Sequence, residues 1–286
     1  MNTAFHNDAN VRDLALKRLR THIAAGRLVP GPLQWNGEQG SLVGCLVESD
    51  ELIVWQAKLG LPQWLAVTLD ALSANLHETA EMEQFGVDCL QAIRVGADVD
   101  ATGSALVVQV LDAAAQATAS VPAGVADSLA AVRALHVRAA ARQAVAPAEW
   151  RAARKAATQV TDTLEEETPA HDLSACVESA AWDPQRASSS VNDVLRLWQN
   201  TCRAQATHDA GWTREIDTRI RTRLQEMFDV HMGGVQGDTI TVFDMLAKYH
   251  PEDHDLVLGR NKIDSDVAVQ LNARAKALLL SALGAA

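Results

Sequence analysis

Aromatic side chains are scarce in this chain of 286 residues: they make up 4% of it, with one tyrosine and four phenylalanines beside seven tryptophans. The core must therefore depend on aliphatic side chains and on helices that approach one another closely. The sequence has no apolar run long enough to span a bilayer, so we expect no membrane segment. The N-terminal sequence MNTAFHNDAN contains neither a basic nor an apolar stretch, so we expect no signal peptide and a cytoplasmic protein.

Cysteine and positive charge are also in short supply. The four cysteines lie far apart and form no CxxC pair, so we expect reduced thiols in the core or on the surface. The chain has 25 Lys and Arg residues against 36 Asp and Glu residues, which gives a formal net charge of −11. This acidic excess is spread along the chain and repels polyanions, which disfavours nucleic acid as a partner.

Motifs that carry known chemistry are missing as well. The sequence contains no GxSxG, no HExxH and no kinase signature. Its glycine-rich segment HMGGVQGD, residues 231–238, lacks the lysine of a nucleoside-triphosphate loop and does not form the dinucleotide GxGxxG pattern. We interpret it as a connector in which Gly233 ends one helix and Asp238 caps the next. The sequence therefore predicts no cofactor and no metal.

Helical periodicity dominates what is present. Apolar residues recur every three to four positions along most of the chain, which predicts an all-α protein, either a multi-helix bundle or an array of antiparallel helices. Residues 27–40, with two prolines and three glycines, are expected to form a loop. The expected helices cover residues 10–25, 50–59, 62–76, 83–93, 101–118, 122–143, 147–157, 190–205, 212–228, 239–249 and 264–283. Ser41 could cap a further short helix.

The segment LGLPQWL, residues 59–65, predicts a sharp corner between two helices. Gly60 stands where a helix end needs a residue that tolerates positive φ, and Pro62 stands in the first turn of the next helix. Trp64 is expected to cover the junction. An apolar stripe then follows on the second helix, formed by Leu65, Leu69, Leu72 and Leu76.

One internal boundary is predicted. The segment TLEEETPAHD, residues 163–172, combines three glutamates with a proline and is expected to form a solvated break. We therefore divide the chain into an N-terminal helical domain, residues 1–168, and a C-terminal helical region, residues 169–286. The second region can pack on the first as one unit.

The most polar candidate site lies near the segment YHPEDHD, residues 249–255. His250 and His254 are four residues apart and could share a metal ion or act in catalysis, and His231 and Asp238 are close enough in sequence to join them. The alternative is a helix that starts at Pro251, with His250 just outside it and acidic residues in its first turn. His231, Asp238, His250 and His254 are therefore the candidate catalytic residues.

Two other constellations have simple structural alternatives. Asp98 and Asp100 could serve as an acid–base pair, but Asp100 is also a natural cap for the helix that follows. A Cys2His2 zinc site is the second possibility, although its H-x4-C and C-x5-H spacings do not match the usual finger pattern. Its members would be His171, Cys176, Cys202 and His208.

The most basic local segment is TREIDTRIRTRL, residues 213–224. Its four arginines do not share one helical face, and Glu215 and Asp217 lie among them, so a salt-bridged solvent face is expected rather than a phosphate site. The four arginines of this segment are Arg214, Arg219, Arg221 and Arg223. A second basic patch covers residues 17–20.

Three segments resemble a family of uncharacterised bacterial and phage proteins. That family has a Val-Gly-Cys segment, a Gly-x-Pro-x-x-Leu helix corner and an alanine-rich helical region. The resemblance covers residues 40–160 and implies bacterial or phage origin and helical character, but no activity or site. The matching positions are Val43, Gly44, Cys45, Gly60, Leu61, Pro62 and Leu65, then CLQAIRVGADVD at 89–100, where Arg94 replaces the family's proline, and EWRAARKAA at 149–157.

These observations predict a soluble helical protein that acts by binding a protein partner or by self-association. The alternative is an enzyme or small-molecule binder with a polar site near residues 231–254. A concave pocket formed by these polar groups would favour that alternative.

Overall fold

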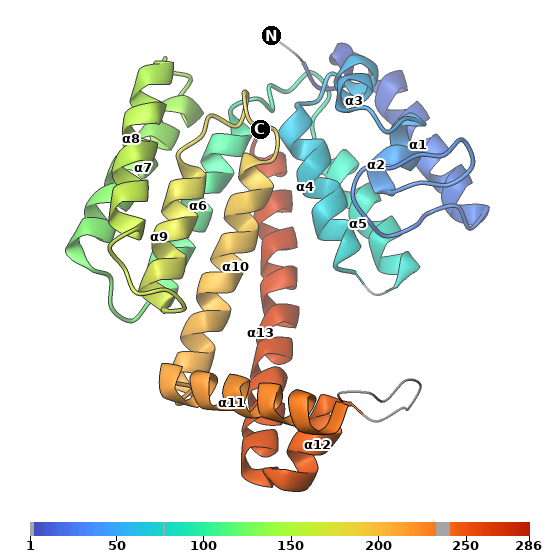
Figure 1. Cartoon of the computed structure of the whole chain (residues 1–286). Coiled ribbons are helices and arrows are strands. Elements are labelled where there is room, and N and C mark those ends of the chain that lie inside the picture. The colour runs from blue at the N-terminus through green and yellow to red at the C-terminus, as the bar shows by residue number, and fades with distance from the viewer. Residues whose placement is uncertain (1–2, 77, 233–240) are drawn as a thin grey trace.

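A computed structural model describes residues 3–76, 78–232 and 241–286. Within these residues the chain forms thirteen α-helices and no β-strand, which confirms the predicted all-α class (Figure 1). Asp238 and the rest of the predicted connector 233–238 lie outside the described residues. None of the described helices is both long enough and apolar enough to cross a membrane.

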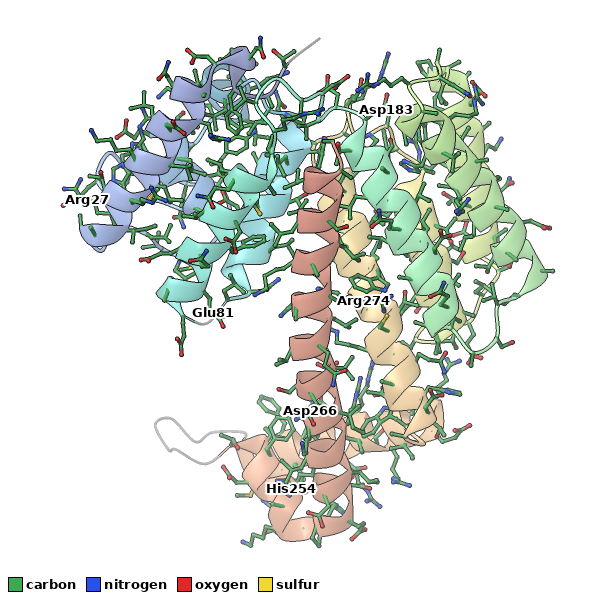
Figure 2. All side chains as sticks on the ribbon, turned by 180° about the vertical axis from the view of Figure 1, so that it is seen from behind. Arg27, Glu81, Asp183, His254, Asp266 and Arg274 are labelled. Atoms are coloured by element: carbon green, nitrogen blue, oxygen red, sulfur yellow. The ribbon has the colours of Figure 1, made fainter. Side chains whose placement is uncertain are left out.

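Two long helices run side by side through the middle of the molecule, and smaller helices lie on both sides of them (Figure 1, and Figure 2 from behind). The central pair is α10 (Ser190–Asp209) and α13 (Pro251–Gly284). One lobe contains the short 3-10 helix η1 (Ala4–Asn7), α1 (Ala9–Ala24), α2 (Leu42–Val47), α3 (Leu52–Leu59), α4 (Gln63–Ala74) and α5 (Thr79–Ala92). The other lobe contains α6 (Thr102–Ala117), α7 (Ala123–Ala140), α8 (Pro147–Thr161) and α9 (Pro169–Ala180).

The predicted corner between two helices is present at α3 and α4. Gly60 has a φ of 64° at the end of α3, and a Cβ atom there would lie 2.3 Å from the Thr3 carbonyl oxygen. Pro62 is the N-cap of α4 and not part of its first turn, because its ψ of 150° is extended. Trp64 is fully buried, as predicted for a residue that covers the junction.

A single large hydrophobic core joins the two lobes to the central helices. It includes Leu69 of α4, Val107 of α6, Val177 of α9 and Leu279 of α13. The predicted boundary at residue 168 falls in the connection between α8 and α9, and both helices contribute to this core. The division into two domains stays a prediction.

A carboxyl group in the first lobe is buried at the start of α2. The Asp70 carboxylate accepts hydrogen bonds from the Ser41 hydroxyl and the Val43 amide, both at 2.8 Å. These bonds satisfy donors at the N-terminus of α2, where a negative charge is favourable. Burial nevertheless raises the pKa of Asp70 to about 7, because an ionised carboxylate is poorly solvated there.

A histidine in the second lobe is buried between α7 and α9. His136 Nε2 lies 2.7 Å from the Ala180 carbonyl oxygen, so this nitrogen carries the proton. The His136 ring meets the Trp150 ring edge-on at 4.8 Å, and Nδ1 has no hydrogen-bond partner among the described residues. Burial lowers the pKa of His136 to about 4, because a second proton would sit on an unpaired buried nitrogen.

The helices α11 (Arg214–Met227) and α12 (Val242–Tyr249) project from the body together with the π-helical turn η2 (Phe228–Met232) and the first turns of α13 (Figure 1). We call residues 212–232 and 241–263 the foot. The foot has a small core of its own around Ile220, Leu246 and Val257. The helix expected over 264–283 is the second part of α13. This helix is continuous from Pro251, where the sequence also predicts a helix start.

Candidate functional site

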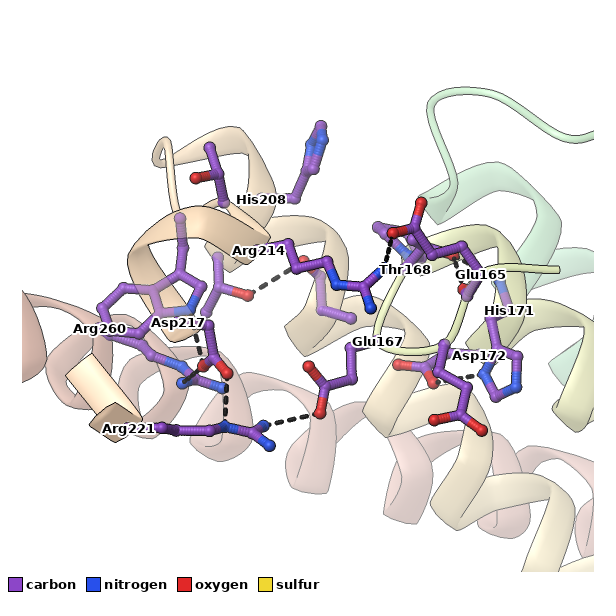
Figure 3. Close-up of a pocket in the computed structure, with 16 residues that line it drawn as sticks. Glu165, Glu167, Thr168, His171, Asp172, His208, Arg214, Asp217, Arg221 and Arg260 are labelled. Carbon is purple, nitrogen blue, oxygen red and sulfur yellow. Dashed lines mark hydrogen bonds and ion pairs between the residues drawn. The ribbon is translucent and has the colours of Figure 1, made fainter. Parts of the chain in front are cut away.

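A hollow of about 620 Å³ lies where the foot joins the body (Figure 3). It is lined by the connection between α8 and α9, the end of α10 and the start of α11. Ten charged or ionisable side chains meet there, and they include both acidic and basic groups. They are Glu165, Glu166, Glu167, His171, Asp172, His208, Arg214, Asp217, Arg221 and Arg260.

Two ion pairs cross this hollow from the foot to the body. Arg214 pairs with Glu165, and Arg221 Nη2 lies 2.7 Å from Glu167 Oε1 (Figure 3). Two of the three glutamates predicted to form a solvated break are thus partners of the arginines of α11. All four side chains are more than half exposed, so each pair contributes little to stability by itself.

Asp217 forms the centre of a second group of contacts. Its carboxylate lies 2.6 Å from Arg221 Nε and 3.0 Å from Arg260 Nη1, and it accepts a hydrogen bond from Trp212 Nε1 at 3.2 Å. The Arg260 guanidinium also lies 4.5 Å from the centre of the Trp212 ring. Because carboxylates compensate each guanidinium of this hollow, the arrangement joins helices and leaves little positive charge for a bound anion.

The remaining arginines of α11 also have acidic partners. Asp253, in the first turn of α13, is fully buried and pairs with Arg223 and with Arg219 Nη2, the latter at 2.9 Å. Arg214, Arg219, Arg221 and Arg223 therefore all form ion pairs, as the sequence predicts. This salt-bridged face extends beyond the segment itself, because Asp253 is buried and four of the partners, Glu165, Glu167, Glu252 and Asp253, belong to other segments.

The proposed Cys2His2 set does not form a metal site. His171 and His208 both line the hollow, whereas Cys176 is fully buried and its thiol donates to the Val194 carbonyl oxygen at 3.6 Å. Burial raises the pKa of Cys176 to about 12, which disfavours the thiolate that would bind a metal. Across the described ranges, no three His, Cys, Asp or Glu side chains converge on one metal position.

Three of the four candidate catalytic residues lie on the foot, and Asp238 lies outside the described residues. His231 is in η2 and stacks on Tyr249 with ring centres 4.7 Å apart. His250 is the N-cap of α13, which starts at Pro251 as the simpler interpretation predicts. His254 is in the first turn of α13, with Nδ1 3.9 Å from an Asp255 carboxylate oxygen. No hydrogen bond joins any two of these three histidines in the described structure.

The two aspartates at the start of α6 line another hollow, of about 310 Å³. The Asp100 amide donates to the Asp98 carboxylate at 3.1 Å, and Arg142 Nη2 lies 3.1 Å from the same carboxylate. The pKa of Asp100 is raised by burial and, to a smaller extent, by Asp98. The cap interpretation of Asp100 is wrong, because Ala101 is the N-cap of α6.

Large apolar side chains are unusually exposed on the foot. Of the eleven that are exposed among the described residues, six belong to this small unit. A concentration of exposed large apolar side chains on one part of a protein commonly marks an interaction site. Periodicity alone did not identify them, because an apolar residue at helical spacing is expected to be buried. They are Phe228, Val230, Phe243, Tyr249, Leu256 and Leu258.

No family model matches the chain, and neither a curated protein nor a solved structure is significantly similar to it. The resemblance described above therefore stays a prediction. Functional inference depends on the surfaces of this chain alone.

Proposed function

We propose that this protein is a protein-interaction module and that the foot is its binding surface. The observation that carries the proposal is the concentration of exposed apolar side chains on the foot. Phe228 is 52% exposed and Val230 is 71% exposed, both in η2 at the end of α11. Leu258 on α13 is 53% exposed. Covering such side chains with a partner is favourable because it removes apolar area from water.

The charges around these side chains favour a basic partner over a second copy of this chain. Five exposed acidic side chains of the foot pair with no lysine or arginine among the described residues, whereas Lys248 is the one foot cation without such a carboxylate partner there. Asp229, Asp244 and Asp255 directly precede or follow exposed apolar residues in the sequence. Two acidic surfaces would repel each other, whereas a basic rim would be attracted. The five carboxylates are those of Glu215, Glu226, Asp229, Asp244 and Asp255.

The expected partner is therefore a protein segment with apolar side chains flanked by lysine or arginine. A synthetic amphipathic helix of leucine and lysine is a suitable probe, with a leucine–glutamate helix of the same pattern as its control. Fluorescence anisotropy is expected to show binding of the lysine peptide, weakened by added salt, and no binding of the glutamate peptide.

Two double variants distinguish binding at this surface from non-specific hydrophobic binding. Phe228→Ser with Val230→Ser removes apolar area from the foot, and we expect it to weaken lysine-peptide binding by about tenfold. Leu14→Ser with Ile53→Ser removes side chains of similar exposure from the body, 56% and 58%, and should leave binding unchanged. Equal loss in both variants, or concentration-dependent dimers in light scattering, would contradict the proposal.

Cytoplasmic location and bacterial or phage origin remain part of this proposal. The alternative of an enzyme or small-molecule binder centred on residues 231–254 has weaker support. In the described part of that segment, His231 packs on an aromatic ring and His250 occupies a helix cap.

A further inference from the structure

A second hollow, of about 380 Å³, lies between α4, α10 and α13, away from the foot. It differs from the hollow of Figure 3 because its polar side chains are amides and arginines. Leu72 of α4 and Leu195 of α10, both buried, form part of its apolar lining. The six polar side chains that line it are Asn75, Asn192, Arg196, Gln199, Arg203 and Asn272.

Four of these polar side chains form one stripe on α10. Asn192, Arg196, Gln199 and Arg203 follow each other at spacings of four, three and four residues, which places them on one helical face. The sequence predicts a helix over residues 190–205 but assigns no role to its polar face. Without α4 and α13 in place, nothing in the sequence distinguishes this polar stripe from an ordinary solvated face.

The charge in this hollow is opposite to that of the protein as a whole. No carboxylate lines it, whereas three other hollows of the described structure are each lined by at least three acidic side chains. Arg196 forms no ion pair with any described carboxylate. Arg203 Nη2 donates to Asn200 at 2.6 Å, and its Nη1 lies 3.5 Å from Asp264, a long contact that leaves donors of the guanidinium available.

The amides can recognise a neutral polar group next to the charged one. Gln199 Nε2 donates to Asn272 Oδ1 at 3.1 Å and so joins α10 to α13. This bond leaves the Gln199 carbonyl as an acceptor and the Asn272 amino group as a donor. Arginine binds carboxylate and phosphate through paired N–H groups, which gives both affinity and orientation.

We propose that this hollow binds a small organic anion that carries hydroxyl or amide groups. Arg196 and Arg203 hold the anionic group, whether it is a carboxylate or a phosphate ester. Gln199 and Asn272 bind the polar groups, and Leu72 contacts the carbon skeleton. The site is independent of the foot, and its ligand is a small molecule and not a protein.

The test is isothermal titration calorimetry on the full chain at low ionic strength. Citrate and glucose 6-phosphate represent the two anionic groups, inorganic phosphate lacks a carbon skeleton, and glucose lacks the charge. We expect citrate or glucose 6-phosphate to bind in the micromolar to millimolar range, and the one that binds identifies the anionic group. Inorganic phosphate is expected to bind more weakly, and glucose is expected not to bind.

Matched variants locate the binding. Arg196→Gln is expected to lower the affinity for the organic anion that binds by about tenfold, because a hydrogen bond to a charged group is lost. Arg186→Gln, which removes a 70% exposed arginine from the connection between α9 and α10, should change nothing. Arg196 is itself exposed, so its variant is expected to keep its circular dichroism spectrum and unfolding midpoint. The absence of heat with both organic anions, or equal weakening by the two variants, would overturn the proposal.

Discussion

Lowering the pH is expected to destabilise this protein through one buried side chain, His136. Its pKa is lowered in the folded state from 6.5 to about 4, whereas the unfolded chain keeps the ordinary value. The unfolded state therefore takes up a proton at a pH where the folded state does not. The stability that neutral His136 contributes is complete above pH 6.5 and is lost as the pH falls toward about 4.

The size of this effect follows from the two pKa values. Between about pH 7.5 and about pH 4.5, proton linkage lowers the free energy of unfolding by about 2.5 kcal/mol. The structural cause is specific, because Nε2 already donates to the Ala180 carbonyl oxygen and Nδ1 has no acceptor. His136→Gln keeps a donor for Ala180 and cannot titrate, so the variant lacks this contribution.

The assay is urea unfolding followed by tryptophan fluorescence at both pH values. We expect His136→Gln to lose about 2.5 kcal/mol less than the parent protein between them. His208→Gln is the matched control, because it replaces a histidine whose side chain is 64% exposed rather than buried. Parallel losses in the parent protein and His136→Gln would refute the reasoning, whatever the stability of the variant at neutral pH.

Three further predictions concern other buried or constrained positions. The pH dependence due to Asp70 has the opposite sign, because its pKa is raised in the folded state. As the pH falls from about 8 to about 5, the free energy of unfolding of the parent protein should rise by about 2.5 kcal/mol relative to that of Asp70→Asn, measured by urea unfolding. A constant difference between the two proteins would contradict this prediction. Gly60→Ala should lower the free energy of unfolding by about 1–3 kcal/mol in the same assay, since the new Cβ meets the Thr3 carbonyl at positive φ; an unchanged midpoint would contradict it. Asp253→Ala removes the shared partner of two arginines, so hydrogen exchange should speed up by about tenfold or more in α11 and α12 but not in α6; uniform exchange rates would count against a separately stabilised foot.

Local sequence patterns predicted most of the helices, although not α9, because a helix depends on neighbours within a few turns. The corner at Gly60 and the helix start at Pro251 depend on backbone preferences, and both are present. The exposure of Phe228 was not predictable, because the period of apolar residues shows which face they share and not whether another helix covers it.

The contacts that build the two hollows could not be predicted from the sequence. Arg214 and Glu165 are 49 residues apart, and Gln199 and Asn272 are 73 residues apart. From the sequence alone, each of these side chains is expected to be an ordinary solvent-exposed polar residue, because its partner is close only in the folded structure. The acidic run and the arginine-rich helix were both identified, but only the packing of the foot on the body shows that they belong together.

The continuity of α13 has a mechanical consequence. This single helix of 34 residues, about 50 Å long, has its first turns in the foot and its last turns among the buried residues of both lobes. A force that a bound partner exerts on the foot is therefore transmitted along a stiff helix whose C-terminal end is held in the core. The foot cannot tilt alone: either the helix bends, or its anchored end slides against α5, α6 and α10.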